Sequence, residues 1–367
     1  MNLTQRRENY RAILAGDKCV HPASVFDPIS ARIAEDLGFE VGMFAGSIAS
    51  GTVLGAPDII VLTLSEFAQQ IHRICRAGNI SLMVDADHGY GNAMNVKRTV
   101  EELETAGVSA LTIEDTLLPR SFGGGDTQLI SLEEGVGKMK AALSGRQDPS
   151  LVVAGRTSAL RTGGVPEAIK RVKAYEQAGV DAVFLAGAQT REEVAAVHAE
   201  VKIPLLLGGA GGELADKEFL GANGVRVALQ GHLPFYAAIK AVYDTLKSLR
   251  DGVAPADLAP GQASADLVAQ VTRKKDYDKW TQEFLSYNSW RKTGYSGMSC
   301  RARRSGQVSG VGEPLACKQS GSISEIRKTD QARANLIPTE ERTHEIHLQP
   351  PAFPQRGPRR GRQILLR

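Results

Sequence analysis

A repeated alternation of short apolar runs with amphipathic stretches constrains this chain more than any other feature of its sequence. Between residues 20 and 250, each apolar run leads into Gly, Asp, Ser or Arg, and a segment of helical periodicity follows. The eight runs are residues 20–26, 41–46, 82–87, 110–115, 151–156, 182–187, 204–209 and 224–231. Strands joined through helices run parallel, because each crossover returns the chain to the same end of the sheet.

Eight such units match the count of a TIM (β/α)8 barrel, which typically takes ~250 residues. A doubly wound open sheet is the alternative, but no G-x-G-x-x-G motif opens a helix after the first run. We therefore predict an α/β fold, a TIM (β/α)8 barrel. An N-terminal helix with Tyr10, Ile13 and Leu14 on one face precedes it, and a C-terminal helical extension that contains KKDYDKWTQEFL follows it.

The charge distribution divides the chain into two parts. Residues 288–367 hold 15 Lys and Arg against 6 Asp and Glu, a net charge of +9, whereas the rest of the chain carries −6. The basic part lacks periodicity and is rich in Arg, Ser, Gly and Pro, which is typical of disorder. We predict a barrel domain with C-terminal helices over residues 1–287 and a disordered tail over 288–367. An arginine-rich tail can bind nucleic acid electrostatically, but we favour a tail without a selected role and expect no nucleic-acid partner.

The composition argues against several other classes of protein. No apolar run reaches the ~20 residues that a membrane-spanning helix requires, and the first 19 residues lack the apolar centre of a signal peptide. The four cysteines, Cys19, Cys75, Cys300 and Cys317, show neither metal-ligand spacing nor a disulfide framework. We therefore expect a cytoplasmic protein without a membrane partner.

Carboxylates follow the third and fourth apolar runs, where the mouth of a barrel would lie. Active sites of TIM barrels occupy the C-terminal ends of the strands. Asp85 and Asp87 are two residues apart, so an extended segment would point both to one face, and Glu114 ends the neighbouring run. Oxygen ligands without paired Cys or His favour Mg²⁺, with Mn²⁺ as the alternative. Each acid alone more often caps a helix or pairs with a lysine, but the three together predict a metal site.

Three further polar residues follow other runs. Arg156 ends the fifth run, where its guanidinium needs a counter-charge or an anionic ligand. Ser47 follows a glycine turn, and its hydroxyl and amide could bind a carbonyl or carboxylate oxygen. His232 follows the last run and could bind a carboxylate or donate a proton. An ion pair between Arg156 and one of the acids, and purely local roles for Ser47 and His232, remain open.

Three segments resemble the isocitrate lyase and phosphoenolpyruvate mutase superfamily. They are SARIAEDLGFEVGMFAGSIAS, DADHGYGNAMNVKRTVEELETAGVSALTIEDT and EEGVGKMKAAL, and the resemblance spans residues 8–287. It implies a TIM barrel that uses Mg²⁺ to make or break a C–C or P–C bond of a 2-oxo acid. It also implies Asp85 as the closest metal ligand, with Asp87 and Glu114 holding its waters. Further implied members of the site are Asp58 as a supporting acid and Ser47 and Arg156 as substrate-binding catalytic residues.

Within the superfamily, PASVFDP, TLLP and His232 after a glycine are similar to the oxaloacetate decarboxylase branch. The resemblance implies a carboxy-lyase that converts oxaloacetate, or a similar 2-oxo diacid, to pyruvate and CO₂ through a metal-stabilised enolate, with His232 contacting the substrate. The loop at 117–129 lacks the cysteine that C–C lyases of the superfamily use as acid.

Two alternatives stay open beside decarboxylation. One is a C–C lyase that acts on a branched malate or a methylisocitrate-like substrate, and the other is a barrel that binds a 2-oxo acid without turning it over. The superfamily also implies a homo-oligomer, a dimer of dimers, in which a C-terminal helix packs on a neighbouring subunit.

Overall fold

The computed structural model describes residues 2–285, and the predicted tail at 288–367 lies outside them. Its centre is a parallel sheet of eight strands, paired in the order in which they occur in the chain. The strands are β1 Ala23–Ser24, β2 Val41–Phe44, β3 Ser81–Asp85, β4 Ala110–Glu114, β5 Val152–Thr157, β6 Ala182–Leu185, β7 Leu205–Leu207 and β8 Val225–Ala228. Each strand overlaps one of the eight predicted runs.

The sheet closes on itself between its first and last strands. Just before β1, Val20 forms a parallel bridge with Val227 of β8. Val20 N donates to Arg226 O at 2.9 Å, and Ala228 N donates to Val20 O at 3.0 Å. The predicted TIM barrel is therefore confirmed.

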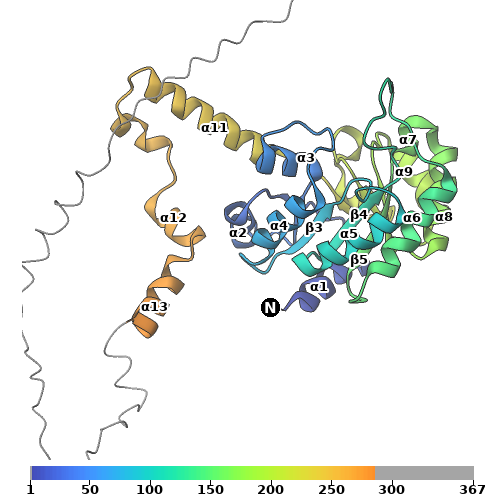
Figure 1. The fold of residues 1–367 in the computed structure, drawn as a ribbon, viewed down its shortest axis with the longest axis horizontal. Helices are drawn as coiled ribbons and strands as arrows, with labels where there is room; N and C mark the ends of the chain where they lie inside the picture. The colour runs from blue at the N-terminus through green and yellow to red at the C-terminus, as the bar shows by residue number, and fades with distance from the viewer. Residues whose placement is uncertain (1, 286–367) are drawn as a thin grey trace, which may run out of the picture. The chain divides into compact units, whose positions relative to one another are not determined.

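Helices follow most of the strands and surround the barrel (Figure 1). The longer helices are α1 Leu3–Ala15, α2 Pro28–Asp36, α4 Leu64–Cys75, α5 Ala93–Ala106, α6 Leu132–Gly145, α8 Gly164–Ala178, α9 Arg191–His198, α11 Leu233–Arg250 and α13 Lys274–Leu285. The shorter ones are α3 Gly46–Ala49, η1 Ser50–Leu54, α7 Ala159–Thr162, η2 Gly212–Ala215, α10 Lys217–Ala222, η3 Pro255–Gly261 and α12 Ala265–Val271.

Local signals fix where individual helices begin and end. Thr63 precedes α4, and its side chain accepts a hydrogen bond from Glu66 N while the Glu66 side chain accepts from Thr63 N. Gly179 ends α8 at a φ of 98°, a left-handed conformation that costs glycine little. Between such ends, the apolar face of α8, including Val172 and Tyr175, is buried against the barrel.

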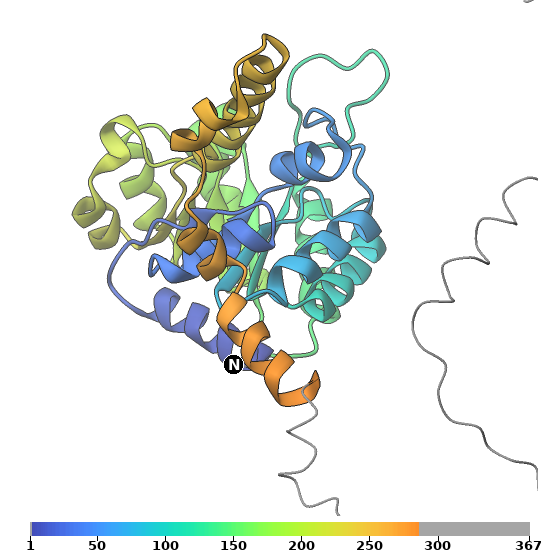
Figure 2. The ribbon, with the colours of Figure 1, turned by 90° about the vertical axis from the view of Figure 1, so that its left-hand side faces the viewer.

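Helix α1 closes the end of the barrel at which the strands begin. Tyr10 is fully buried, and its hydroxyl lies 3.2 Å from Met83 Sδ of β3. Arg7 is also buried; it donates to Glu104 O at 2.7 Å and pairs with Asp148 at 2.7 Å. Figure 2 shows α1 at one end of the molecule and the long loop between β4 and α6 at the other. The polar strand ends therefore open on the side opposite α1.

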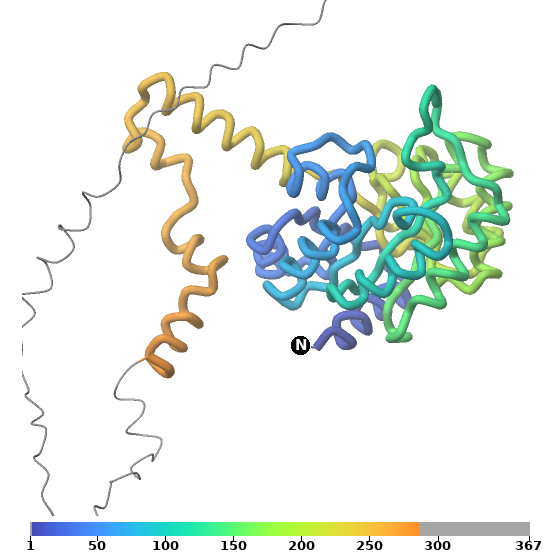
Figure 3. The backbone as a smooth tube through the Cα atoms, in the orientation of Figure 1, coloured from blue at the N-terminus to red at the C-terminus, as the bar shows by residue number. Residues whose placement is uncertain are grey.

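The C-terminal extension leaves the barrel and then returns to it. Helix α11 has no buried residue along its 18 positions, and Figure 3 shows its segment of the backbone running away from the barrel. At the end of α12, Gln270 donates to the Asp36 carboxylate of α2 at 3.1 Å, and Arg273, just beyond α12, pairs with the same carboxylate at 2.7 Å. Helix α13 coincides with the predicted helical sequence KKDYDKWTQEFL. Across residues 2–285, no helix is long and apolar enough to cross a membrane.

Candidate active site

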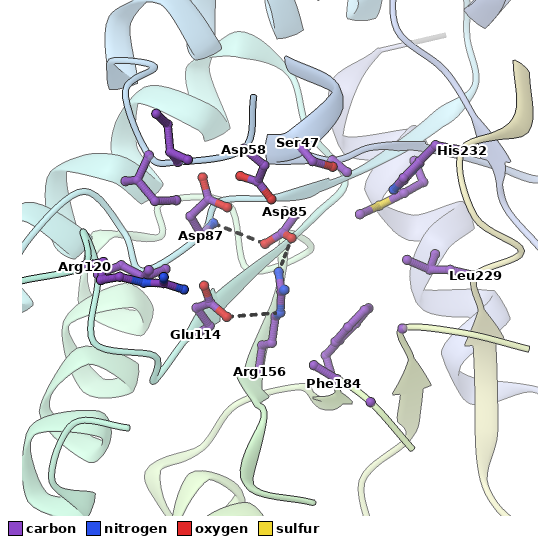
Figure 4. Close-up of a pocket in the computed structure, with 18 residues that line it drawn as sticks. Ser47, Asp58, Asp85, Asp87, Glu114, Arg120, Arg156, Phe184, Leu229 and His232 are labelled. Carbon is purple, nitrogen blue, oxygen red and sulfur yellow. Dashed lines mark hydrogen bonds and ion pairs between the residues drawn. The ribbon is translucent and has the colours of Figure 1, made fainter. Parts of the chain in front are cut away.

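The polar strand ends meet in one cavity at the C-terminal mouth of the barrel. Its volume is about 490 Å³, and 18 residues line it (Figure 4). All seven predicted site residues are among them: Ser47, Asp58, Asp85, Asp87, Glu114, Arg156 and His232. Apolar side chains, including Phe184 and Leu229, complete the wall. The cavity thus combines a carboxylate cluster with an apolar side.

Asp85 and Asp87 reach the cavity through a turn rather than through strand alternation. Strand β3 ends at Asp85, and Asp87 lies beyond it with a φ of 48°, so the predicted extended geometry is wrong at this position. Asp87 N donates to Asp85 Oδ1 at 3.1 Å, which holds the turn. A Cβ atom on Gly46 would lie 2.5 Å from the Asp87 carboxylate, so a glycine at position 46 is required for this approach.

Arg156 of β5 joins the carboxylates of the two neighbouring strands. Its Nη1 contacts Asp85 Oδ2, and its Nε lies 3.4 Å from Glu114 Oε2. Glu114 also accepts a hydrogen bond from Thr116 Oγ1 at 2.9 Å. The ion pair between Arg156 and the acids, which the sequence alone did not decide, is therefore present. Arg156 Nη2 makes no hydrogen bond to residues 2–285, so it remains available to an anion.

The carboxylates carry more negative charge than Arg156 offsets. Burial raises the pKa of Asp87 well above its ordinary value, and the charges of Asp85 and Glu114 raise it further. Burial also raises the pKa of Glu114, against the lowering effect of Arg156. At the rim, partial burial and the charge of Asp85 raise the pKa of Asp58. A cation placed among these groups would stabilise their ionised forms.

A divalent cation fits this donor set in charge and chemistry. Within residues 2–285, no three or more His, Cys, Asp or Glu side chains form a ready-made ligand cage. Mg²⁺ takes one or two direct carboxylates and keeps several waters, so a site centred on Asp85, with Asp87 and Glu114 around the waters, needs no such cage. Burial and the neighbouring charges of Asp85 and Glu114 raise the pKa of Asp87, and a dication beside it would act against both causes.

His232 and Ser47 lie on the side of the cavity away from Glu114 (Figure 4). His232 precedes α11, and its Nδ1 lies 2.9 Å from Ser24 Oγ, a contact that orients the ring. Burial lowers the pKa of His232, against the raising effect of Asp85, so the neutral ring prevails near pH 7. The ring can therefore accept or relay a proton at the mouth of the barrel.

Asp115 faces away from the cavity, as its position beside Glu114 predicts. It is fully buried, and its Oδ2 accepts from Arg171 Nη1 at 2.9 Å and from Tyr175 OH at 2.6 Å. Arg171 Nη2 also donates to Ile130 O at 2.9 Å, directly after the loop at 117–129. We call Asp115, Arg171 and Tyr175 the Asp115 cluster, which anchors one end of that loop.

Two cations near the site were not predicted from the sequence. Arg120 lines the cavity from the loop at 117–129, and the signal that could have found it is that no other Lys or Arg occurs in that loop. Lys138 of α6 is only 2% exposed, and its Nζ donates to His88 O at 2.9 Å, next to Asp87. In the sequence, Lys138 resembles any surface lysine of an amphipathic helix, so nothing marked it.

The family model described as phosphoenolpyruvate phosphomutase matches residues 11–250, which is more than half of the chain. The chain belongs to this family. The match runs from the last part of α1 to the end of α11, so it covers all eight strands and every residue that lines the cavity. It agrees with the superfamily that the sequence motifs resemble.

Individual relatives and solved structures extend the comparison. A protein named oxaloacetate decarboxylase from Bradyrhizobium diazoefficiens is 57% identical over 276 residues, which cover 75% of this chain and 96% of the relative. A crystal structure of phosphonopyruvate hydrolase with oxalate and Mg²⁺ has a TM-score of 0.69 at 28% identity, over 77% of this chain and 99% of the other. A structure of oxaloacetate acetylhydrolase with its product oxalate has a TM-score of 0.66 at 27% identity, over 76% and 98%.

Proposed function

We propose that this protein decarboxylates oxaloacetate, or a closely similar 2-oxo diacid, to pyruvate and CO₂. One observation carries the proposal: a carboxylate cluster around Arg156 lies in the barrel mouth of a chain that is 57% identical to an oxaloacetate decarboxylase over nearly all of that relative. A divalent metal belongs to the proposal, with Mg²⁺ as the first choice and Mn²⁺ as the alternative, because the donors are hard oxygens.

In the proposed reaction, the bond between C3 and the departing carboxylate breaks, and its electron pair stays on the remaining fragment as an enolate. A bound divalent cation would supply Lewis-acid stabilisation of that negative charge. Arg156 Nη2, which has no partner among residues 2–285, would orient the retained carboxylate. Ser47 would donate a hydrogen bond to the oxygen on which negative charge develops.

Protonation of C3 completes the reaction and needs a proton from solvent. His232 is placed to hold the water that supplies it, because Ser24 orients the ring. The ring is neutral near pH 7, so it can pass a proton without first losing one. No cysteine of the loop is needed in this scheme.

Release of CO₂ and pyruvate from oxaloacetate in the presence of Mg²⁺ tests the proposal directly. Asp85→Ala removes the predicted direct metal ligand, so we expect a loss of about 10²- to 10³-fold in kcat, on the scale of a lost catalytic electrostatic interaction. Circular dichroism should show that the variant is folded. A variant with more than a tenth of the wild-type rate would contradict the assignment of Asp85.

The same assay separates the alternatives within the family. Formation of oxalate and acetate would indicate hydrolysis of the C–C bond, as in the name of the acetylhydrolase relative. Cleavage of 2,3-dimethylmalate or methylisocitrate, without decarboxylation of oxaloacetate, would indicate a lyase. Saturable binding without any turnover would support a barrel that binds 2-oxo acids.

We also propose a homo-oligomer, a dimer of dimers, in the cytoplasm. Helix α11 carries a row of exposed apolar side chains that includes Ile239, Val242 and Leu246. A pocket of about 430 Å³ beside β1 and α2 is lined by apolar residues such as Phe26 and Ile33. We assign this pocket to α11 of a second copy, because α11 leaves its own barrel without covering it.

The proposed cytoplasmic location rests on the cysteines. The thiols of Cys19 and Cys75 are free and buried, which is in keeping with a reducing compartment.

A further inference from the structure

Arg120 is a cation that reaches the cavity without a partner. It lines the cavity from the loop between β4 and α6. Figure 4 shows its guanidinium directed toward the side on which Asp87 and Glu114 lie. Within residues 2–285 it takes part in no hydrogen bond and no ion pair, whereas Arg156 is already engaged with Asp85 and Glu114.

Contacts at both ends of the loop hold Arg120 over the site. Thr116 and Leu129 form an antiparallel bridge. Leu117 N donates to Gln128 O at 2.8 Å, and Ile130 N donates to Asp115 O at 2.9 Å. The loop therefore begins and ends beside Glu114. Arg120 is four residues beyond the bridge, so the fixed base keeps its side chain near the mouth.

The charges of the cavity require such a residue if the substrate is a dianion. Four carboxylates line the cavity, from Asp58, Asp85, Asp87 and Glu114. A dication and the partly engaged Arg156 would still leave the site without a positive group for the second carboxylate of a diacid. Among the lining residues within 2–285, Arg120 is the remaining cation. Its guanidinium matches a carboxylate in geometry and charge.

We propose that Arg120 binds the carboxylate that the substrate loses, and so selects diacids over monoacids; this inference rests on the proposed function. The bond from C3 to that carboxylate breaks, the electron pair stays on C3 and the neutral CO₂ no longer attracts the guanidinium. Arg120 thus binds the substrate at least as strongly as it binds the transition state. Its removal should therefore raise KM and leave kcat unchanged or higher.

The test compares Arg120→Gln with the wild-type enzyme on ligands that have and lack the departing carboxylate. For oxaloacetate we expect KM to rise about three- to tenfold, as for loss of one partly exposed ion pair, while kcat does not fall. For oxalate, a stand-in for the pyruvate enolate, the inhibition constant should change less than about twofold. Arg120→Lys should restore part of the lost affinity. Lys140→Gln, which removes an exposed positive charge from α6 outside the cavity, is the matched control.

Each other outcome has a defined meaning. Equal weakening of oxaloacetate and oxalate would show attraction by overall charge and would overturn the inference, as would an unchanged KM. If the wild-type protein releases no CO₂ from oxaloacetate, the proposed function fails. Calorimetric titration with malate and with lactate, which differ by the same carboxylate, then still tests Arg120. If Arg120→Gln lowers the affinity for malate but not for lactate, the role of Arg120 is upheld. If it lowers the affinity for both ligands or for neither, the role is overturned.

Discussion

At the scale of single residues, the turn that follows Asp85 combines charge, burial and unusual backbone geometry. His88 is buried beside Asp87, and its Nδ1 has no hydrogen-bond partner among the described residues. Burial lowers the pKa of His88 to about 4, with a further lowering from the charge of Lys138. The folded protein therefore holds this ring neutral, and charging it costs stability.

This residue predicts a pH dependence of stability for the metal-free protein. The pKa of histidine in the unfolded chain is about 6.5, above the folded value of about 4. The contribution of His88 is therefore fully present above about pH 6.5 and is lost as the pH falls toward 4, by up to about 1.4 kcal/mol per pH unit. Urea denaturation in the presence of a chelator should show this loss.

His88→Gln provides the control, because the raised pKa of Asp87 acts in the opposite direction in both proteins. The difference in unfolding free energy between wild type and His88→Gln should shrink with falling pH across the window from 6.5 to 4. A difference that stays constant with pH would mean that His88 titrates normally.

The residues that line the cavity differ in how far the sequence predicted their positions. Asp85, Glu114 and Arg156 were predictable because every strand of a closed parallel barrel delivers its last residue to one mouth. The left-handed conformation of Asp87 was not, because it depends on space left by Gly46, a residue from another strand end. Arg120 was missed for a similar reason: contacts distant in sequence decide where a loop lies.

At the scale of elements, the loop at 117–129 depends on the Asp115 cluster. Arg171 both neutralises the buried Asp115 carboxylate and donates to Ile130 O at the end of the loop. Tyr175 contacts the same carboxylate but not the loop. Substitution of Tyr175 should therefore affect the stability of the core alone, whereas substitution of Arg171 should affect both the core and the restraint of the loop.

We predict that Arg171→Met lowers the unfolding free energy by about 3–5 kcal/mol, because it leaves a buried carboxylate without its cation. It should also speed cleavage by trypsin after Arg120, because the loop loses an anchor. Tyr175→Phe, the matched control, should cost about 1.5–3 kcal/mol for one hydrogen bond to a charged group without faster cleavage. Equal cleavage rates in both variants would argue against Arg171 as the anchor.

Strands were the most predictable elements, and the role of α11 was the least. The apolar runs are long enough to specify buried parallel strands, and the structure has a strand in each. Helix α11 has the three- and four-residue spacing of apolar residues that is expected of an amphipathic helix, as at Ile239, Val242 and Leu246. A periodic pattern predicts that the apolar face of a helix packs against another surface, but it does not identify that surface. The departure of α11 from its own barrel therefore could not be predicted.

At the scale of the whole molecule, the exposed face of α11 predicts association between copies. Replacing Val242 and Leu246 together with Asp places charge at positions four apart on one apolar face. Light scattering should show a decrease in mass by at least half at micromolar concentration. Lys240→Gln, which alters an exposed polar position of the same helix, should leave the mass unchanged. Association that survives the double substitution would exclude α11 as the contact.

The closure of the barrel by α1 has a consequence for how this enzyme could be re-engineered. Arg7 and Tyr10 hold the floor, and no residue that lines the cavity belongs to that helix. Substituting residues that line the cavity should therefore change the substrate specificity without lowering the melting temperature. Substituting Arg7 or Tyr10 of α1 should instead yield mostly insoluble protein.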